Sequence, residues 1–84
     1  MKVTPRIEKV KVLKDKQLYI KFCDGKEKVF DMKNLIETNL FYKKLKNREY
    51  FSKVKPNGIT VQWPDGEDVC PENLYYESVN FNSL

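Results

Sequence analysis

Four carboxylates lie close together in this 84-residue chain and form its nearest approach to a chemical site. They are Asp65, Glu67, Asp68 and Glu72. Such a cluster offers oxygen ligands to a hard cation, or a pair of groups for general acid–base work. The spacing lacks the alternating ligands and closing glutamate of a calcium loop, and turn and helix-end roles explain Asp65 and Glu72. Small-ligand or metal binding at this acidic loop is kept as an alternative, and no cofactor is expected.

Histidine is absent from the sequence, which excludes histidine-based catalytic triads and histidine metal sites. The three glycines, Gly25, Gly58 and Gly66, each sit in a turn signal, so there is no glycine-rich phosphate loop. Cys23 and Cys70 are far apart in the chain and are expected to be reduced, unpaired thiols. We therefore predict no catalytic residues and a protein that is not an enzyme.

Basic residues recur between positions 43 and 55 and are interleaved with Tyr42 and Tyr50. Such a run can follow a phosphate backbone while aromatic rings stack on bases, although a solvated helical face shows the same pattern. The candidate basic surface consists of Lys43, Lys44, Lys46 and Arg48. A nucleic-acid-binding or transcription-accessory role is therefore an alternative function.

Charge is divided along the chain. All 16 lysines and arginines lie at or before Lys55, accompanied by 7 carboxylates, whereas residues 56–84 carry the remaining 5 carboxylates alone. The net charge of +4 thus combines +9 in the first part with −5 in the second. Either the acidic part folds against the basic part, or the surface presents two opposed fields to a partner.

Alternating apolar residues predict three antiparallel strands, over residues 6–14, 17–23 and 26–31. The apolar face of the middle strand is made of Leu18, Ile20 and Phe22. Asp24-Gly25 predicts a two-residue hairpin loop in which both central residues have positive φ.

Short helices are expected to follow the meander. Asp31 is placed to cap residues 32–36, and Asn47 to cap residues 48–51. The four-residue spacing of Phe41 and Leu45 predicts that both lie on one helical face. Four tyrosines are expected to point outward and to offer contact area to a partner: Tyr19, Tyr42, Tyr50 and Tyr76.

The only tryptophan lies in a strand-like run that starts at Ile59. Because Ile59, Val61 and Trp63 alternate with Thr60 and Gln62, the first three are expected to face the core. The indole should be the largest single burial of the domain.

A corner follows this run. The segment Pro64-Asp65-Gly66 has the residues of a turn, and Pro71 suits the first position of a helix. We expect the structural or interaction cluster of the protein to be Trp63, Pro64, Asp65, Gly66, Asp68, Pro71 and Tyr75.

These elements predict an α+β fold, in which a three-stranded meander and a later hairpin form a small antiparallel sheet with short helices packed on it. The length suits one domain over residues 1–84, with a tail over residues 78–84 that is expected to fray. The sequence has no long apolar run and no apolar leader, so we expect a cytoplasmic protein without membrane contact.

Over nearly its whole length, the chain resembles a small bacterial family named domain of unknown function 2442. The most specific part is the ending Trp63-Pro64-Asp65-Gly66, Asp68, Pro71 and Leu74-Tyr75. The earlier matching residues are Pro5, Val10, Leu18, Phe22, Asp24-Gly25, Phe30-Asp31, Phe41, Leu45, Phe51 and Gly58. The resemblance implies an α+β domain.

Some members of that family resemble one half of a toxin–antitoxin pair, being encoded beside another small protein. Together with the missing catalytic parts and the opposed charges, this implies a non-enzymatic protein-interaction module, with another small protein or a second copy as its partner.

Overall fold

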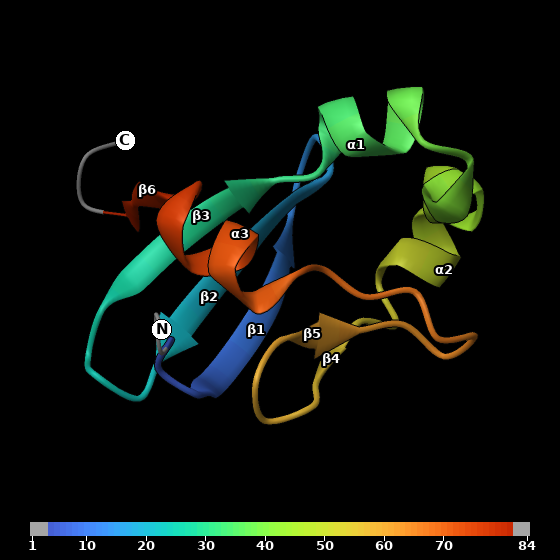
Figure 1. The fold of residues 1–84 in the computed structure, drawn as a ribbon. Helices are drawn as coiled ribbons and strands as arrows, with labels where there is room; N and C mark the ends of the chain where they lie inside the picture. The colour runs from blue at the N-terminus through green and yellow to red at the C-terminus, as the bar shows by residue number, and fades with distance from the viewer. Residues whose placement is uncertain (1–3, 82–84) are drawn as a thin grey trace.

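The computed structural model describes residues 4–81. A four-stranded antiparallel sheet carries short helices and a separate two-stranded hairpin, so the predicted α+β fold is confirmed (Figure 1). Strand order in the sheet is β1-β2-β3-β6. The bounds are β1 Ile7–Leu13, β2 Gln17–Phe22, β3 Glu27–Asp31 and β6 Val79–Asn80.

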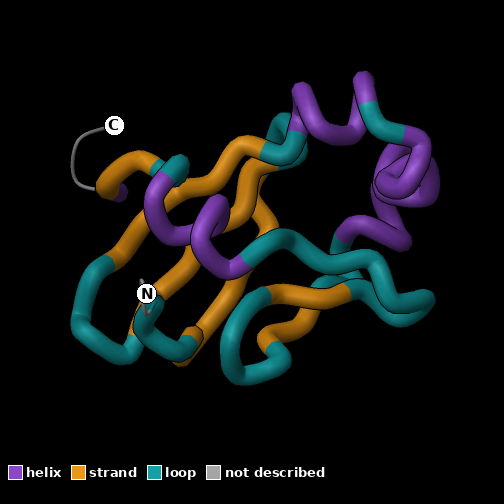
Figure 2. Tube along the Cα trace, viewed as in Figure 1, coloured by secondary structure: helices purple, strands orange, loops and turns teal. Residues whose placement is uncertain are grey.

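The remaining elements form a second layer. They are α1 Lys33–Thr38, the 3-10 helix η1 Leu40–Lys46, α2 Arg48–Phe51, β4 Lys55–Pro56, β5 Val61–Gln62 and α3 Pro71–Tyr76. Helices α1, η1 and α2 follow one another around one end of the sheet, and α3 crosses in front of it (Figures 1 and 2). The hairpin β4–β5 is tied to the start of β1, where the Ile7 backbone N–H donates to the Gly58 oxygen over 3.1 Å.

The sheet gains its fourth strand from the end of the chain. We expected residues 78–84 to fray, but Val79 and Asn80 pair with Val29 and Lys28 of β3. The ring of Phe81 also meets Tyr19 edge to face, with 5.2 Å between centroids. Residues 82–84 of the expected tail lie outside the described part.

The core lies between the sheet and the second layer. As predicted, Leu18, Ile20 and Phe22 of β2 are all buried, and Trp63 is only 2% exposed. The indole N–H of Trp63 donates to the Phe51 carbonyl oxygen over 2.9 Å, which satisfies the one polar group of that ring in the interior.

The predicted alternation fails at its first two positions. Ile59 is 55% exposed and Thr60 only 2% exposed, the reverse of the expectation. The Asn57 side-chain oxygen accepts the backbone N–H groups of both residues, so they belong to a turn and β5 begins only at Val61. The Thr60 hydroxyl is satisfied in the interior by the Val69 carbonyl oxygen over 2.6 Å.

The helical face predicted around Phe41 is also wrong. Phe41 is 55% exposed, whereas Tyr42 and Leu45 are buried. The segment consists of two short 3-10 turns joined by a kink at Tyr42, whose φ of −98° and ψ of 16° are not helical, so no single helical face carries both Phe41 and Leu45. Tyr42, expected to point outward, therefore faces the core, and its hydroxyl donates to the Asp68 carbonyl oxygen over 2.9 Å.

The β2–β3 hairpin is confirmed, but its loop is not the predicted one. The Phe22 N–H donates to the Lys26 oxygen and the Gly25 N–H donates to the Phe22 oxygen, so three residues span the turn. Gly25 has a φ of 91°, and Asp24 does not have the positive φ that a two-residue loop needs. Asp24 instead accepts the Lys26 backbone N–H on its carboxylate over 2.9 Å.

The predicted cap at Asn47 is present, whereas the N-cap position of α1 is Met32 and Asp31 lies one residue before it. The Asp31 carboxylate accepts the Lys33 backbone N–H over 2.8 Å at the start of α1, and the Asn47 side-chain oxygen accepts that of Tyr50 over 3.0 Å. Pro71 is the first residue of α3, as expected.

The exchange of roles between Ile59 and Thr60 can be tested by mutation. Thr60→Val should lower the free energy of unfolding by about 1–2 kcal/mol, because the Val69 carbonyl loses its buried donor. Ile59→Thr should change it by less than about 0.5 kcal/mol, since the side chain is mostly in water. Urea titrations of both variants measure these changes. A larger loss of unfolding free energy for Ile59→Thr than for Thr60→Val would instead support the alternation in which Ile59 faces the core.

Candidate functional site

The turn after Trp63 is held from the helical side by a tyrosine. The Tyr50 hydroxyl donates to Glu67 Oε1 over 2.6 Å and accepts the Asp65 backbone N–H over 2.9 Å. Tyr50, expected to point outward, thus faces this turn, and burial together with the bond to Glu67 raises the pKa of its phenol. The Asp65 carboxylate pairs with Lys44, which lowers the pKa of Asp65 and raises that of Lys44. Glu67 and Asp65 are therefore engaged by side chains of this chain.

The other residues of the acidic loop lie at the surface. Pro64 and Gly66 form the exposed turn, while Asp68 is exposed and bonds to Tyr42 through its backbone only. In the part of the chain that the structure describes, no group of three or more cysteine and acidic side chains could hold a metal ion. Cys23 and Cys70 are both exposed and unpaired.

Tyr75 anchors α3 to the opposite end of the sheet from the acidic loop. Its hydroxyl donates to Asp24 Oδ2 over 2.8 Å, and its carbonyl oxygen accepts from Lys28 Nζ over 2.8 Å. The Lys28 ammonium also lies 4.2 Å from the centre of the Tyr75 ring. Desolvation lowers the pKa of Lys28, while the Lys26 N–H and the Tyr75 hydroxyl lower that of Asp24. The arrangement joins a helix to a hairpin.

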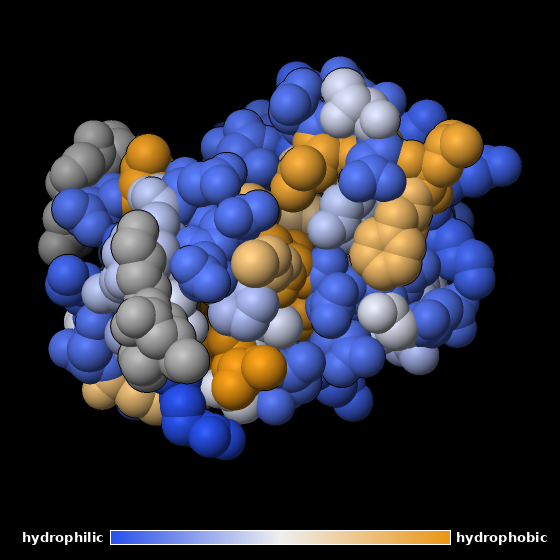
Figure 3. Space-filling view, in the orientation of Figure 1, coloured by the Kyte–Doolittle hydropathy of each residue, from blue (hydrophilic) through white to orange (hydrophobic). Residues whose placement is uncertain are grey.

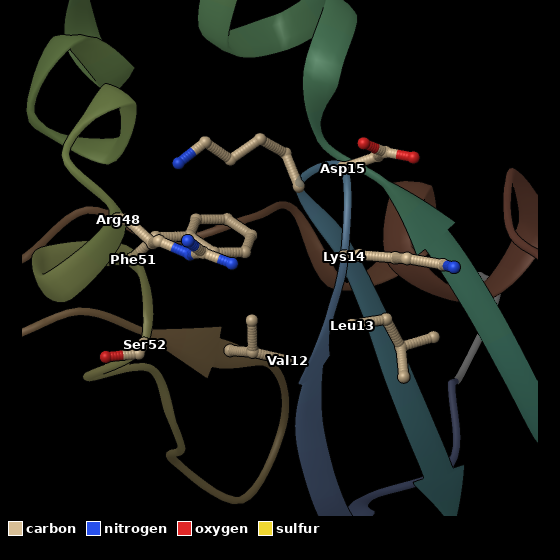
Figure 4. A pocket seen from close by; sticks show the side chains of 8 residues that line it. Val12, Leu13, Lys14, Asp15, Arg48, Phe51 and Ser52 are labelled. Carbon is tan, nitrogen blue, oxygen red and sulfur yellow. The ribbon is translucent and has the colours of Figure 1, made fainter.

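The structure separates Lys44 from the other three residues of the predicted basic surface. Lys44 lies beside Tyr50 and is paired with Asp65, whereas Arg48 lines a different depression, between the β1–β2 turn and α2. That depression has a volume of about 480 Å³. Figure 4 shows Arg48, Phe51 and Val12 gathered on one side of it. Its complete lining is Val12, Leu13, Lys14, Asp15, Lys16, Arg48, Phe51 and Ser52.

Two smaller depressions continue from this one. Lys16 also lines a depression of about 290 Å³ with Lys33 and Lys46. Lys46 in turn lines one of about 120 Å³ with Lys43 and Leu40. Because each shares lining residues with the next, the three lie in succession along one surface, here called the basic track, from Arg48 to Leu40.

Sequence reasoning missed Lys16 and Lys33, two members of the basic track that lie outside the run of basic residues at positions 43–55. Lys16 belongs to the β1–β2 turn, and Lys33 begins α1. Neither is near Arg48 in the chain, and only the packing of the turn against η1 and α2 brings them together. No local pattern marks that packing, so the signal available was the charge excess of residues 1–55.

Comparison with known proteins gives one match. The family model described as "Protein of unknown function (DUF2442)" matches residues 7–80, from the first residue of β1 to the last of β6. The chain belongs to this family. No curated protein and no solved structure matches the chain. Among the described residues of this family member, no helix is long and apolar enough to cross a membrane.

The bond between Tyr75 and Asp24 predicts a pH effect. The folded-state pKa of Asp24 lies below its ordinary value of 3.8, so the carboxylate stabilises the fold above that pH and loses this effect as the pH falls through the folded-state pKa. Asp24→Ala should therefore cost about 1 kcal/mol at pH 7 and less near pH 3. Urea titrations at both pH values measure the difference.

Glu77→Ala is the matched control, because it removes an exposed carboxylate just after α3. Its cost should stay below about 0.5 kcal/mol at both pH values. An Asp24→Ala cost that is equal at pH 7 and pH 3 would contradict this role of the carboxylate.

Proposed function

We propose that this protein is a non-enzymatic interaction module of the bacterial cytoplasm that binds another small protein through the basic track. The observation that carries the proposal is Leu40, whose side chain is 88% exposed at the end of that track. A leucine so exposed at the start of a 3-10 helix contributes little to the fold, and its burial by a partner would be favourable.

The surroundings of Leu40 have the composition of an interface. Phe41, the next residue, is also largely exposed, and Lys43 and Lys46 line the same depression as Leu40. Figure 3 shows apolar atoms over the η1 region bordered by hydrophilic ones. An apolar centre with a charged rim is the usual arrangement of a protein–protein contact.

A role as one half of a toxin–antitoxin-like pair is the specific form of this proposal. Its support is the resemblance to relatives that are encoded beside a second small protein, and the engagement of Asp65 and Glu67 in the fold. The neighbouring gene product is therefore the first partner to test.

Mutation of Leu40 tests the contact. Leu40→Ser should weaken binding of the neighbouring gene product at least about tenfold, equivalent to about 1.4 kcal/mol, because it removes apolar area from the contact. Ile59→Ser is the matched control, since Ile59 is likewise an exposed aliphatic residue but lies in the β4–β5 loop. Isothermal titration calorimetry measures both. Absence of binding by the unmodified protein at low and moderate salt, or equal losses for the two variants, would refute the proposal.

Nucleic-acid binding is the second candidate, favoured by the six cations that line the basic track. They are Lys14, Lys16, Lys33, Lys43, Lys46 and Arg48. If phosphates occupy this track, affinity for duplex or single-stranded nucleic acid should fall about 10- to 100-fold between 50 and 200 mM salt, because bound counterions are released. A gel-shift series measures this. No shift at 50 mM salt would rule the candidate out.

A further inference from the structure

We propose that the basic track binds an extended acidic segment of the partner protein, with an apolar side chain of that segment seated between Arg48 and Lys16. This inference rests on the proposed function and deepens it by naming the chemistry of the partner. Its basis is the depression beside α2, which has an apolar floor, several cations and a single lining carboxylate, Asp15.

The depression combines an apolar floor with cationic walls. Val12 and Phe51 form the floor, and Arg48 stands beside them (Figure 4). The side chains of Lys14 and Asp15 point away from this group in Figure 4. Asp15, the one carboxylate of the lining, therefore does not neutralise Arg48.

Lys16 is already held in position. Its Nζ donates to the Lys46 carbonyl oxygen over 3.3 Å and lies 5.0 Å from the centre of the Phe51 ring. An ammonium has three N–H donors, and one of them is used by this bond. A carboxylate that arrives at Lys16 thus meets an ammonium that is already positioned, which reduces the entropy lost on binding.

Neither cation is neutralised by the protein itself. Among residues 4–81, the ion pairs are Lys21 with Glu8 and Lys44 with Asp65, and neither involves Lys16 or Arg48. The guanidinium of Arg48 is suited to bidentate pairing with a carboxylate.

Beyond Lys16, the basic track is again lined mainly by cations. Lys33 and Lys46 line the next depression, where Glu37 is the carboxylate of the lining. Apart from Lys14 and Asp15, whose side chains point away in Figure 4, the two depressions are lined by four cations, Lys16, Lys33, Lys46 and Arg48, and by one carboxylate, Glu37. A segment with several acidic residues in extended conformation matches this row, whereas a single anion would meet only one end of it.

An acidic peptide fits better than a nucleic acid. Stacking of bases requires exposed aromatic faces, and in the depression beside α2 the aromatic residue of the lining, Phe51, is only 2% exposed with the Lys16 ammonium over its ring. The partly exposed Val12 adds an apolar floor that suits an aliphatic side chain. The observations therefore favour carboxylates that flank an apolar residue.

Fluorescence anisotropy with three labelled probes tests this inference. The probes are the peptide Gly-Glu-Leu-Glu-Gly-Glu-Leu-Glu-Gly, the same peptide with glutamine in place of every glutamate, and a twelve-residue oligothymidine. The glutamate peptide should bind saturably and at least about tenfold more tightly than the glutamine peptide, because only carboxylates pair with the two cations.

Charge reversal locates the site. Arg48→Glu should weaken binding of the glutamate peptide at least about tenfold, and Lys16→Gln several-fold. Lys55→Glu is the matched control: Lys55 is an exposed cation on β4 and lines none of the three depressions. Its effect should stay within about threefold, the change expected from net charge alone. Thermal unfolding checks that each variant is folded, and Arg48→Gln replaces Arg48→Glu if the reversal does not fold.

Three results would overturn the inference: equal binding of the glutamate and glutamine peptides, equal losses in the Arg48 and Lys55 variants, or an oligothymidine that binds more tightly than the glutamate peptide and depends on Arg48. The test is separable from that of the proposed function. If the glutamate peptide binds through Arg48 but the neighbouring gene product does not bind, the partner assignment fails and the acidic-segment site stands.

Discussion

The hydrogen bond from the Trp63 indole to the Phe51 carbonyl oxygen connects the tryptophan turn to α2, the helix beside the proposed binding surface. Helix α2 has a single turn, too short to be stable alone, so its position depends on what it packs against. The buried indole fixes the last residue of that turn from one side. The other side of the same residue forms the floor of the depression lined by Arg48 and Lys16. Trp63 thus supports the proposed binding surface without lining it.

The loops that follow Phe22 and Trp63 have the same hydrogen-bond pattern. After Phe22 and after Trp63, the aromatic residue donates its N–H to the oxygen four residues on and accepts from the glycine three residues on. In each loop a tyrosine from elsewhere in the chain bonds to the aspartate before the glycine: Tyr75 to the carboxylate of Asp24, and Tyr50 to the backbone N–H of Asp65. These bonds explain why acidic residues and tyrosines recur here without forming a chemical site.

The basic and acidic parts of the sequence remain largely separate on the surface of the folded protein. One link between the basic and acidic parts is the pair Lys44–Asp65, which is exposed and open to screening by salt. Much of the positive charge therefore stays at the surface, where the β1–β2 turn, α1, η1 and α2 collect it into the basic track. The interaction proposed for this protein follows from that surplus together with the exposed Leu40.

The sequence by itself determined the meander, the cap at Asn47, the helix start at Pro71 and the burial of Trp63, because each depends on neighbouring residues or on a strong preference of one side chain. Tertiary structure decided the rest. Thr60 turned inward because Val69 offers an acceptor in the interior, and Tyr42 did so at a kink between two short turns, where its hydroxyl reaches the Asp68 carbonyl oxygen. Lys16 reached Phe51 only through packing of a turn against a helix thirty or more residues away in the chain, and such contacts leave no periodicity to read.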